Sequence, residues 1–295
     1  MNKIGFYLVK FWTVFLSVQP FWLLYLKSDF YYFLVYHVFR YRRKVVRENL
    51  LRSFPEKDPK AIKVIECHFY HNLCDQFVEA PKMMQMGDNG YRKRITFTNS
   101  ELPGQLYNQK KNVFYAIPHS GNWEWFGKMI PELSSHKGLA IYKKVKNASF
   151  EQLMLMMRTK DSTLEMVESN SALKRLAQLR NELNAVLMMA DQSPRGVDSD
   201  YWTTFLHQET CWFTGLERIA MLLDYSIVFV DMKRTGRGFY EIGFELLADD
   251  PKSMVKGEIM ERYVRRVEQF ILAEPDNWLW SHRRWKHHRN QGVER

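Results

Sequence analysis

Short apolar runs alternate with amphipathic segments along most of this chain. Apolar runs bounded by polar or turn-forming residues predict buried strands, and longer stretches with apolar residues three or four apart predict helices. The predicted strands are 95–98, 113–117, 138–142, 185–190, 226–232 and 239–247; the predicted helices are 58–84, 123–129, 149–158, 171–181, 215–224 and 256–273. This alternation predicts an α/β fold with a central mixed sheet flanked by helices. Gly236 and Gly238 predict a hairpin turn between the last two strands.

The N-terminal segment 1–39 is apolar and rich in aromatic rings, and we expect it to be a membrane anchor ahead of a single domain at 40–295. Residues 11–26 carry no charge. As a helix they would rise only about 24 Å, less than the roughly 30 Å hydrocarbon layer, and Pro20 would kink them. We therefore expect a membrane-inserted helix or helical hairpin, with a buried core helix as the alternative. The cations between Arg40 and Arg47 would place the following domain on the cytoplasmic side.

Charge and composition favour anionic partners. The chain has 43 Lys and Arg against 33 Asp and Glu, a formal net charge of +10, and aromatic residues make up 15%. Such an excess of cations suits lipid headgroups, nucleic acid or an acidic carrier protein. Nucleic acid is disfavoured because the basic residues form no compact recognition motif.

Three cysteines cannot pair completely, so no disulfide framework is expected. Cys67, His71 and Cys74 fall on one face of the predicted helix 58–84. A zinc site usually needs a second pair of ligands elsewhere, so the pattern favours ordinary helix packing and no metal.

The segment 115–125 carries the candidate chemistry. His119 and Glu124 stand five apart where an apolar strand meets a helix, and the intervening Gly121 breaks the strand. A neutral imidazole can remove a proton from an attacking alcohol, and a carboxylate on its other nitrogen fixes the tautomer. We expect His119 to be the base and Glu124 to orient it. The alternative is a strand-end histidine beside a surface glutamate.

Seven segments together resemble the late acyltransferases of lipid A biosynthesis, within the lysophospholipid acyltransferase superfamily. The segment 118–124 is similar to that superfamily's H-x4-D/E motif. The other matching segments follow in the family's order: Arg47-Glu-Asn-Leu50 with Ser53-Phe-Pro-Glu56, Ile141-Tyr-Lys-Lys-Val-Lys-Asn147, Arg158, Ala190-Asp-Gln192, Thr214-Gly-Leu-Glu-Arg-Ile-Ala220, and Trp278-Leu-Trp-Ser-His-Arg-Arg-Trp-Lys286. The resemblance covers about 40–288, so we expect 40–295 to be an acyltransferase domain with a glycerolipid-acyltransferase-like fold.

The chain also departs from the family pattern. Lys143 stands where arginine is usual, and it keeps the charge but loses the planar fork that grips a phosphate. Ala148 replaces a usual proline, and Leu206-His207 replaces a common Phe-Gly pair. These changes border the region that holds the acceptor in the family.

The resemblance implies O-acyl transfer from acyl carrier protein to a hydroxyl of an anionic lipid A precursor, at the cytoplasmic face of the inner membrane. No metal or redox cofactor is required. A relative that uses acyl-CoA, or that acylates another glycolipid or an aminolipid, would carry the same motif. A non-catalytic membrane-binding relative would keep the fold and tolerate loss of His119.

Several further residues are candidates for binding substrate. Asn122 or a backbone amide after Pro118 would hold the oxyanion. Lys143 and Arg158 would meet anionic substrate groups, with surface charge as the alternative. Asp191 would shape the site from its strand end, or cap the following turn without a catalytic role. The basic cluster near the C-terminus would face lipid phosphates or the acidic carrier; it comprises Arg283, Arg284 and Lys286.

Overall fold

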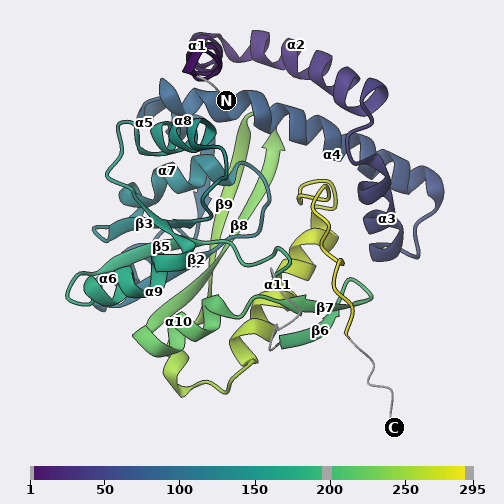
Figure 1. The fold of residues 1–295 in the computed structure, drawn as a ribbon. Coiled ribbons are helices and arrows are strands. Elements are labelled where there is room, and N and C mark those ends of the chain that lie inside the picture. The colour runs from purple at the N-terminus through teal and green to yellow at the C-terminus, as the bar shows by residue number, and fades with distance from the viewer. Residues whose placement is uncertain (1–2, 195–200, 290–295) are drawn as a thin grey trace.

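The computed structural model describes residues 3–194 and 201–289; the first two residues of the expected anchor, and 195–200 and 290–295 of the expected domain, lie outside the described residues. Within the described ranges the chain forms a central sheet with helices on both faces (Figure 1). The predicted α/β fold with a mixed sheet is confirmed.

Seven strands of the described chain form the main sheet, in the order β1-β9-β8-β2-β5-β3-β4. Their bounds are β1 (Ile95–Thr98), β2 (Asn112–Ala116), β3 (Lys137–Tyr142), β4 (Glu165–Glu168), β5 (Asn184–Met188), β8 (Tyr225–Gly236) and β9 (Phe239–Ala248). All neighbours are parallel except β8 and β9, which form an antiparallel hairpin. Gly238 at the turn has a φ of 71°, which glycine adopts at little cost, so the predicted hairpin is confirmed.

Three strands were not predicted. β4 is a short edge strand that begins and ends with glutamate, so it lacks an apolar run. A separate hairpin joins β6 (Tyr201–Phe205) to β7 (Gln208–Trp212). Its turn holds Leu206 and His207 at positive φ angles of 47° and 64°. Such turns usually contain Asn or Gly, and the sequence carries neither there.

The central strands are buried on both faces, which explains their continuous apolar runs. On β2, Val113 and Tyr115 pack with helices on one face of the sheet, while Phe114 and Ala116 pack on the other. The first face is covered mainly by α7 (Trp123–Leu133) and α8 (Ala148–Thr159). The second is covered by α9 (Ala172–Gln178), α10 (Gly215–Leu223) and α11 (Glu258–Ala273). Each face therefore has its own hydrophobic core.

The helices that follow or flank the strands match the predicted segments closely, except that 58–84 is divided and several short helices were not predicted. In the described chain the α-helices are α3 (Arg43–Ser53), α4 (Pro59–Glu79), α5 (Asp88–Arg92), α6 (Leu102–Asn108), α7 (Trp123–Leu133), α8 (Ala148–Thr159), α9 (Ala172–Gln178), α10 (Gly215–Leu223) and α11 (Glu258–Ala273). The 3-10 helices of the same ranges are η2 (Ala80–Met84), η3 (Ser169–Ser171) and η4 (Pro251–Ser253). Asp58 caps α4 by accepting a hydrogen bond from the Ala61 amide at 2.8 Å.

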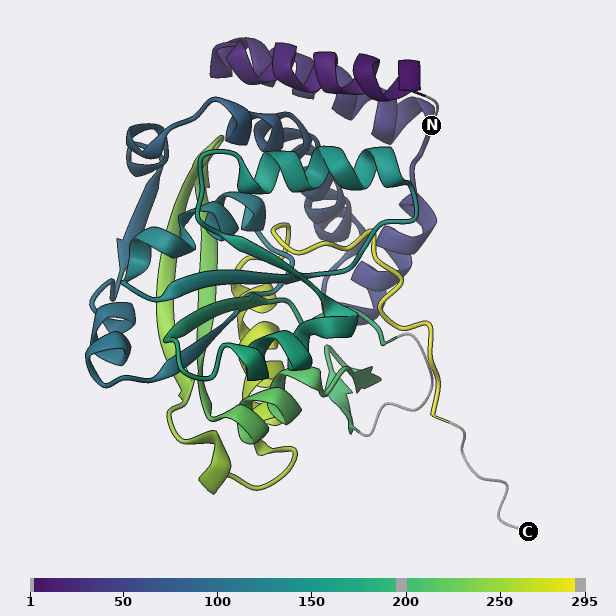
Figure 2. The same ribbon diagram turned by 60° about the vertical axis from the view of Figure 1, so that its left-hand side comes forward.

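The N-terminal segment forms α1 (Lys3–Val18), α2 (Phe21–Tyr32) and the π-helix η1 (Phe33–Val38). In both Figure 1 and Figure 2, α1 and α2 lie as an outer layer over the rest of the fold. Leu16 of α1 and Leu24 of α2 are buried on the inner side of this layer. The Lys82 ammonium donates to the carbonyls of Ser17 and Gln19, each at 2.8 Å.

No helix in the described ranges combines the length and the apolar character needed to cross a bilayer. The expected N-terminal anchor is therefore unsupported as a spanning element, because Pro20 divides the apolar stretch into two helices that pack against the domain. Their outward side chains are largely apolar and include residues about two-thirds exposed: Tyr7, Leu8, Phe11 and Trp22.

The face of α4 that carries two cysteines packs against the N-terminal helices. The Cys67 thiol lies 3.7 Å from the Tyr36 hydroxyl, and the His71 ring stacks on the Tyr32 ring with centroids 3.6 Å apart. Cys74 is buried. Helix packing accounts for the spacing of these three residues.

Candidate active site

His119 and Asp191 meet because their strands are neighbours. His119 lies in the turn that follows β2, and Asp191 lies just beyond the end of β5. β2 and β5 are parallel, and their last residues, Ala116 and Met188, are register partners. Parallel neighbours end at the same edge of a sheet, where binding sites of α/β folds commonly form. Residues 72 apart in sequence are thereby brought into contact.

The His119 ring is held by the Asp191 carboxylate. Its Nδ1 lies 2.6 Å from Asp191 Oδ1, and the His119 backbone amide donates to Oδ2 at 2.9 Å. The Trp278 indole also donates to Oδ2, at 2.8 Å. An ionised carboxylate only accepts hydrogen bonds, so this contact keeps a proton on Nδ1 and leaves Nε2 of a neutral ring as a base.

The surroundings of Asp191 keep it ionised. Its side chain is only 1% exposed, and burial by itself raises the pKa of a carboxyl. The electrostatic interaction with His119, and the hydrogen bonds from His119 and Trp278, outweigh that effect and lower the pKa of Asp191 to about 2. Asp191 is therefore a permanent anion at neutral pH.

Glu124 does not contact His119, which we expected it to orient. It lies in the first turn of α7 and forms a two-point ion pair with Arg158 of α8, with Nε–Oε2 at 2.8 Å and Nη2–Oε1 at 2.6 Å. Both side chains are largely buried, at 12% and 22% exposed. The prediction that Glu124 orients His119 is corrected: Asp191 holds Nδ1, and α7 directs Glu124 toward α8.

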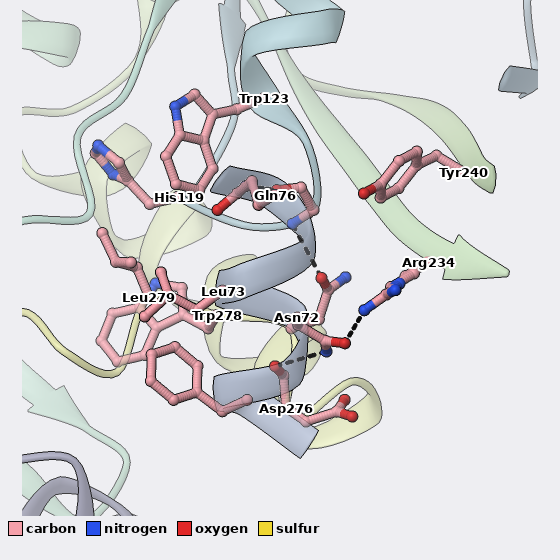
Figure 3. A pocket seen from close by; sticks show the side chains of 13 residues that line it. Asn72, Leu73, Gln76, His119, Trp123, Arg234, Tyr240, Asp276, Trp278 and Leu279 are labelled. Carbon is pink, nitrogen blue, oxygen red and sulfur yellow. Dashed lines mark hydrogen bonds between the residues drawn. The ribbon is translucent and has the colours of Figure 1, made fainter. Parts of the chain in front are cut away.

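Two narrow cavities adjoin these pairs, and Trp123 lines both. The first, about 20 Å³, has His119 on one side and Arg234 and Tyr240 on the other (Figure 3). The second, about 40 Å³, contains Glu124 and Arg158 in a wall that is otherwise mainly apolar. Its apolar lining includes Ala140, Ile141, Leu164, Met166, Leu187 and Met189. Neither cavity has the volume of a fatty acyl chain, but the second places apolar side chains directly beside the polar turn.

The expected oxyanion donors are occupied within the protein. Asn122 is fully buried; its Oδ1 caps α7 by accepting from the Trp125 amide at 3.2 Å, and its Nδ2 donates to Glu79 at 3.0 Å. The Ser120 amide donates to the Pro118 carbonyl at 2.7 Å. These groups therefore shape the turn, and the expectation that one of them holds an oxyanion is not supported by their contacts.

Glu79 supports this turn from behind and was not recognised from the sequence. It is fully buried at the end of α4 and accepts from the Tyr240 hydroxyl at 2.6 Å, from Asn122, and from the Tyr25 hydroxyl at 3.1 Å. Burial raises its pKa. An isolated glutamate inside a helical pattern gives no sequence signal for such a position.

The C-terminal segment closes the other side of the turn. The Leu279 amide donates to the His119 carbonyl at 3.0 Å, and Asn277 Oδ1 accepts from the Gly121 amide at 3.0 Å. Gln76 of α4 donates to the Gly121 carbonyl. Trp278 lay within a matching motif, but the motif did not reveal that it donates to Asp191.

The remaining predicted binding residues are separated. Lys143 is exposed after β3, and Arg283 is exposed in the C-terminal segment. Arg284 is 1% exposed, donates to the Cys211 carbonyl at 2.8 Å and stacks 4.3 Å from the Trp212 ring. Burial lowers the pKa of Arg284 to about 10. The prediction that Arg284 faces lipid phosphates or a carrier is wrong, because its side chain points into the core.

Comparison with known proteins agrees with the motifs. None of the curated proteins compared with this chain matches it. The family described as bacterial lipid A biosynthesis acyltransferase matches residues 2–287, nearly the whole chain. The family identified from the ordered motifs is thereby confirmed. This protein belongs to the bacterial lipid A biosynthesis acyltransferase family.

Proposed function

We propose that the protein transfers a fatty acyl group from acyl carrier protein to a hydroxyl of a lipid A precursor. His119 Nε2 removes the hydroxyl proton as the oxygen attacks the thioester carbonyl. The tetrahedral intermediate then expels the carrier thiolate, which takes that proton back from the imidazolium. The products are an ester on the lipid and a free thiol on the carrier.

The observation that carries this proposal is the 2.6 Å contact between His119 Nδ1 and Asp191. A buried anion at that distance fixes the ring tautomer and stabilises the imidazolium formed after proton transfer. The His119 side chain also lines the first cavity and is 15% exposed, so the ring is not sealed in the core.

The Glu124–Arg158 pair has a separate task in this proposal. Glu124 holds the guanidinium of Arg158 in one orientation at the wall of the second cavity. α7 begins at Trp123, so the positive end of its dipole lies at the same turn. We propose that this fixed cation and the helix end stabilise the negative oxygen of the tetrahedral intermediate.

The outward face of α1 and α2 supports membrane association of a different kind from a spanning anchor. Phe11 and Trp22 are 68% and 65% exposed on helices whose other face packs on the domain. Large exposed apolar faces mark interaction sites, and aromatic rings settle at lipid interfaces. We propose that these two helices lie in the headgroup region of the inner membrane, on its cytoplasmic side.

The test of function is transfer of labelled acyl groups to purified lipid A precursor by the intact protein. Wild type should produce the ester, and His119→Ala should reduce its rate by at least about 10³-fold while the protein remains folded. Parallel reactions with acyl-CoA, and with another glycolipid or an aminolipid, identify the donor and the acceptor. Near-normal transfer by His119→Ala would refute the assigned base.

A further inference from the structure

A basic cavity lies between α3 and the C-terminal segment. Seven of its eleven lining residues are Arg or Lys and one is acidic, and its volume is about 650 Å³. Arg40, Lys44 and Arg52 line it from the N-terminal side, and Arg283 and Lys286 line it from the C-terminal side. All five of these side chains are exposed. No residue that lines this cavity takes part in the proposed mechanism.

Specific contacts hold the two walls together. Asn49 of α3 is buried, and its amide donates to the carbonyls of Trp280 and His282 at 2.9 and 3.0 Å. Arg42 donates to the Ser281 carbonyl at 2.9 Å. Hydrogen bonds between two segments more than 200 residues apart therefore fix the shape of the cavity.

The cavity is connected to the catalytic histidine through a short piece of chain. Leu279 contacts the His119 carbonyl, and Arg283 follows only four residues later. Four residues span at most about 14 Å, so the cations of this wall lie within reach of a substrate arm that ends at His119. A ligand bound here would therefore need to extend a flexible arm only a short distance to reach the site.

The position of the cavity favours a soluble partner. In both ribbon views α1 and α2 form the outer layer, and α3 and the C-terminal segment lie below it (Figures 1 and 2). A bilayer in contact with the outward face of α1 and α2 would leave the basic cavity away from the lipid surface. Exposed cations around the partly apolar surfaces of Val45 and Trp285 also resemble a protein interface, which has a polar rim around an apolar centre.

We infer that this cavity is the docking surface for the acidic carrier protein that brings the acyl thioester. This inference rests on the proposed function, because it assigns a surface to that donor. Carboxylates of the carrier would pair with the cations, and its flexible pantetheine arm would run along the C-terminal segment toward His119. Such pairing speeds association and weakens with salt.

The experiment measures binding of fluorescently labelled acyl carrier protein, which requires no turnover. The site variant reverses three cavity charges: Arg40→Glu, Arg52→Glu and Lys286→Glu. The control variant reverses three exposed cations elsewhere and so changes the net charge equally: Lys174→Glu, Arg180→Glu and Lys256→Glu. The site variant should lose carrier affinity at least tenfold relative to the control, and wild-type affinity should fall as salt is raised from 50 to 500 mM.

The outcomes separate this inference from the proposed function. Equal carrier affinity in the two variants would overturn the inference, and so would selective loss of binding to phosphatidylglycerol vesicles by the site variant, which would assign the cavity to lipid. Failure of wild type to bind the carrier, with transfer from acyl-CoA intact, would overturn the docking surface but leave acyl transfer standing. His119→Ala should abolish transfer and retain carrier binding. If the triple site variant does not fold, Lys286→Glu alone is compared with Lys256→Glu.

Discussion

Two carboxylates flank the same turn, and they do different things. Asp191 is a buried anion against His119, whereas Glu124 is locked in a two-point pair with Arg158. Glu124 is five residues from the histidine in sequence, and Asp191 is 72 residues away. The comparison shows that in this fold the partner of His119 is set by the order of strands in the sheet and not by distance along the chain.

The largest difference between the two carboxylates should appear on neutralising Asp191. Asp191→Asn keeps the shape of the side chain but removes the charge that fixes the ring tautomer and supports the imidazolium. We expect acyl transfer to fall by about 10³-fold or more, as in other oriented-histidine sites. Steady-state rates with a melting curve check this, and loss of less than tenfold would show that Asp191 does not orient the base.

The second expected effect is smaller and belongs to the other pair. Glu124→Gln leaves one acceptor for Arg158 but removes the ionic partner of a largely buried guanidinium. We expect transfer to fall by about 10- to 100-fold, with a pH profile of the same shape as wild type, since the base and its orienter are untouched. A loss as large as that of Asp191→Asn, with a shifted pH profile, would return the orienting role to Glu124.

Combined substitutions sharpen the contrast. In the proposed mechanism His119 and Asp191 act as one unit, so the double variant His119→Ala/Asp191→Asn should be no more than about threefold slower than His119→Ala alone. The double variant His119→Ala/Glu124→Gln should lose a further tenfold or so, because the proposed role of the Glu124–Arg158 pair is to stabilise a different charge, that of the oxyanion. Residual rates measured at high enzyme concentration provide the comparison, and the reverse pattern would contradict it.

The smallest expected effect is the change in the free energy of unfolding at low pH. The pKa of Asp191 is lowered to about 2 in the folded protein, below its usual value near 4. A lowered carboxyl pKa means that the ionised form stabilises the fold at neutral pH, and that this contribution is lost as pH falls from about 4 to 2. The free energy of unfolding of wild type should therefore approach that of Asp191→Asn over this range. A constant difference between them down to pH 2 would contradict the lowered pKa.

The sequence was sufficient for the fold class and for six of the seven strands of the main sheet, because the central strands are buried on both faces. Their continuous apolar runs, such as the one that contains Val113 and Tyr115, mark them without any knowledge of the fold. The hairpin β6–β7 was not predicted, because its turn places Leu206 and His207 at positive φ without the Asn or Gly that usually indicates such a turn.

The sequence located the histidine but not its partner. The order β2-β5 within the sheet, which brings Asp191 to His119, depends on long-range pairing that no local pattern encodes. Arg284 was misplaced for a related reason. The C-terminal segment has no regular period, so nothing local shows that Arg283 is exposed while Arg284 packs on Trp212.

The most direct test of the account is the proton on His119 Nδ1, observed by nuclear magnetic resonance in protein labelled with nitrogen-15 at histidine. The account predicts a strongly downfield Nδ1–H resonance in wild type that persists in Glu124→Gln and is lost in Asp191→Asn. A resonance that survives in Asp191→Asn and disappears in Glu124→Gln would contradict it.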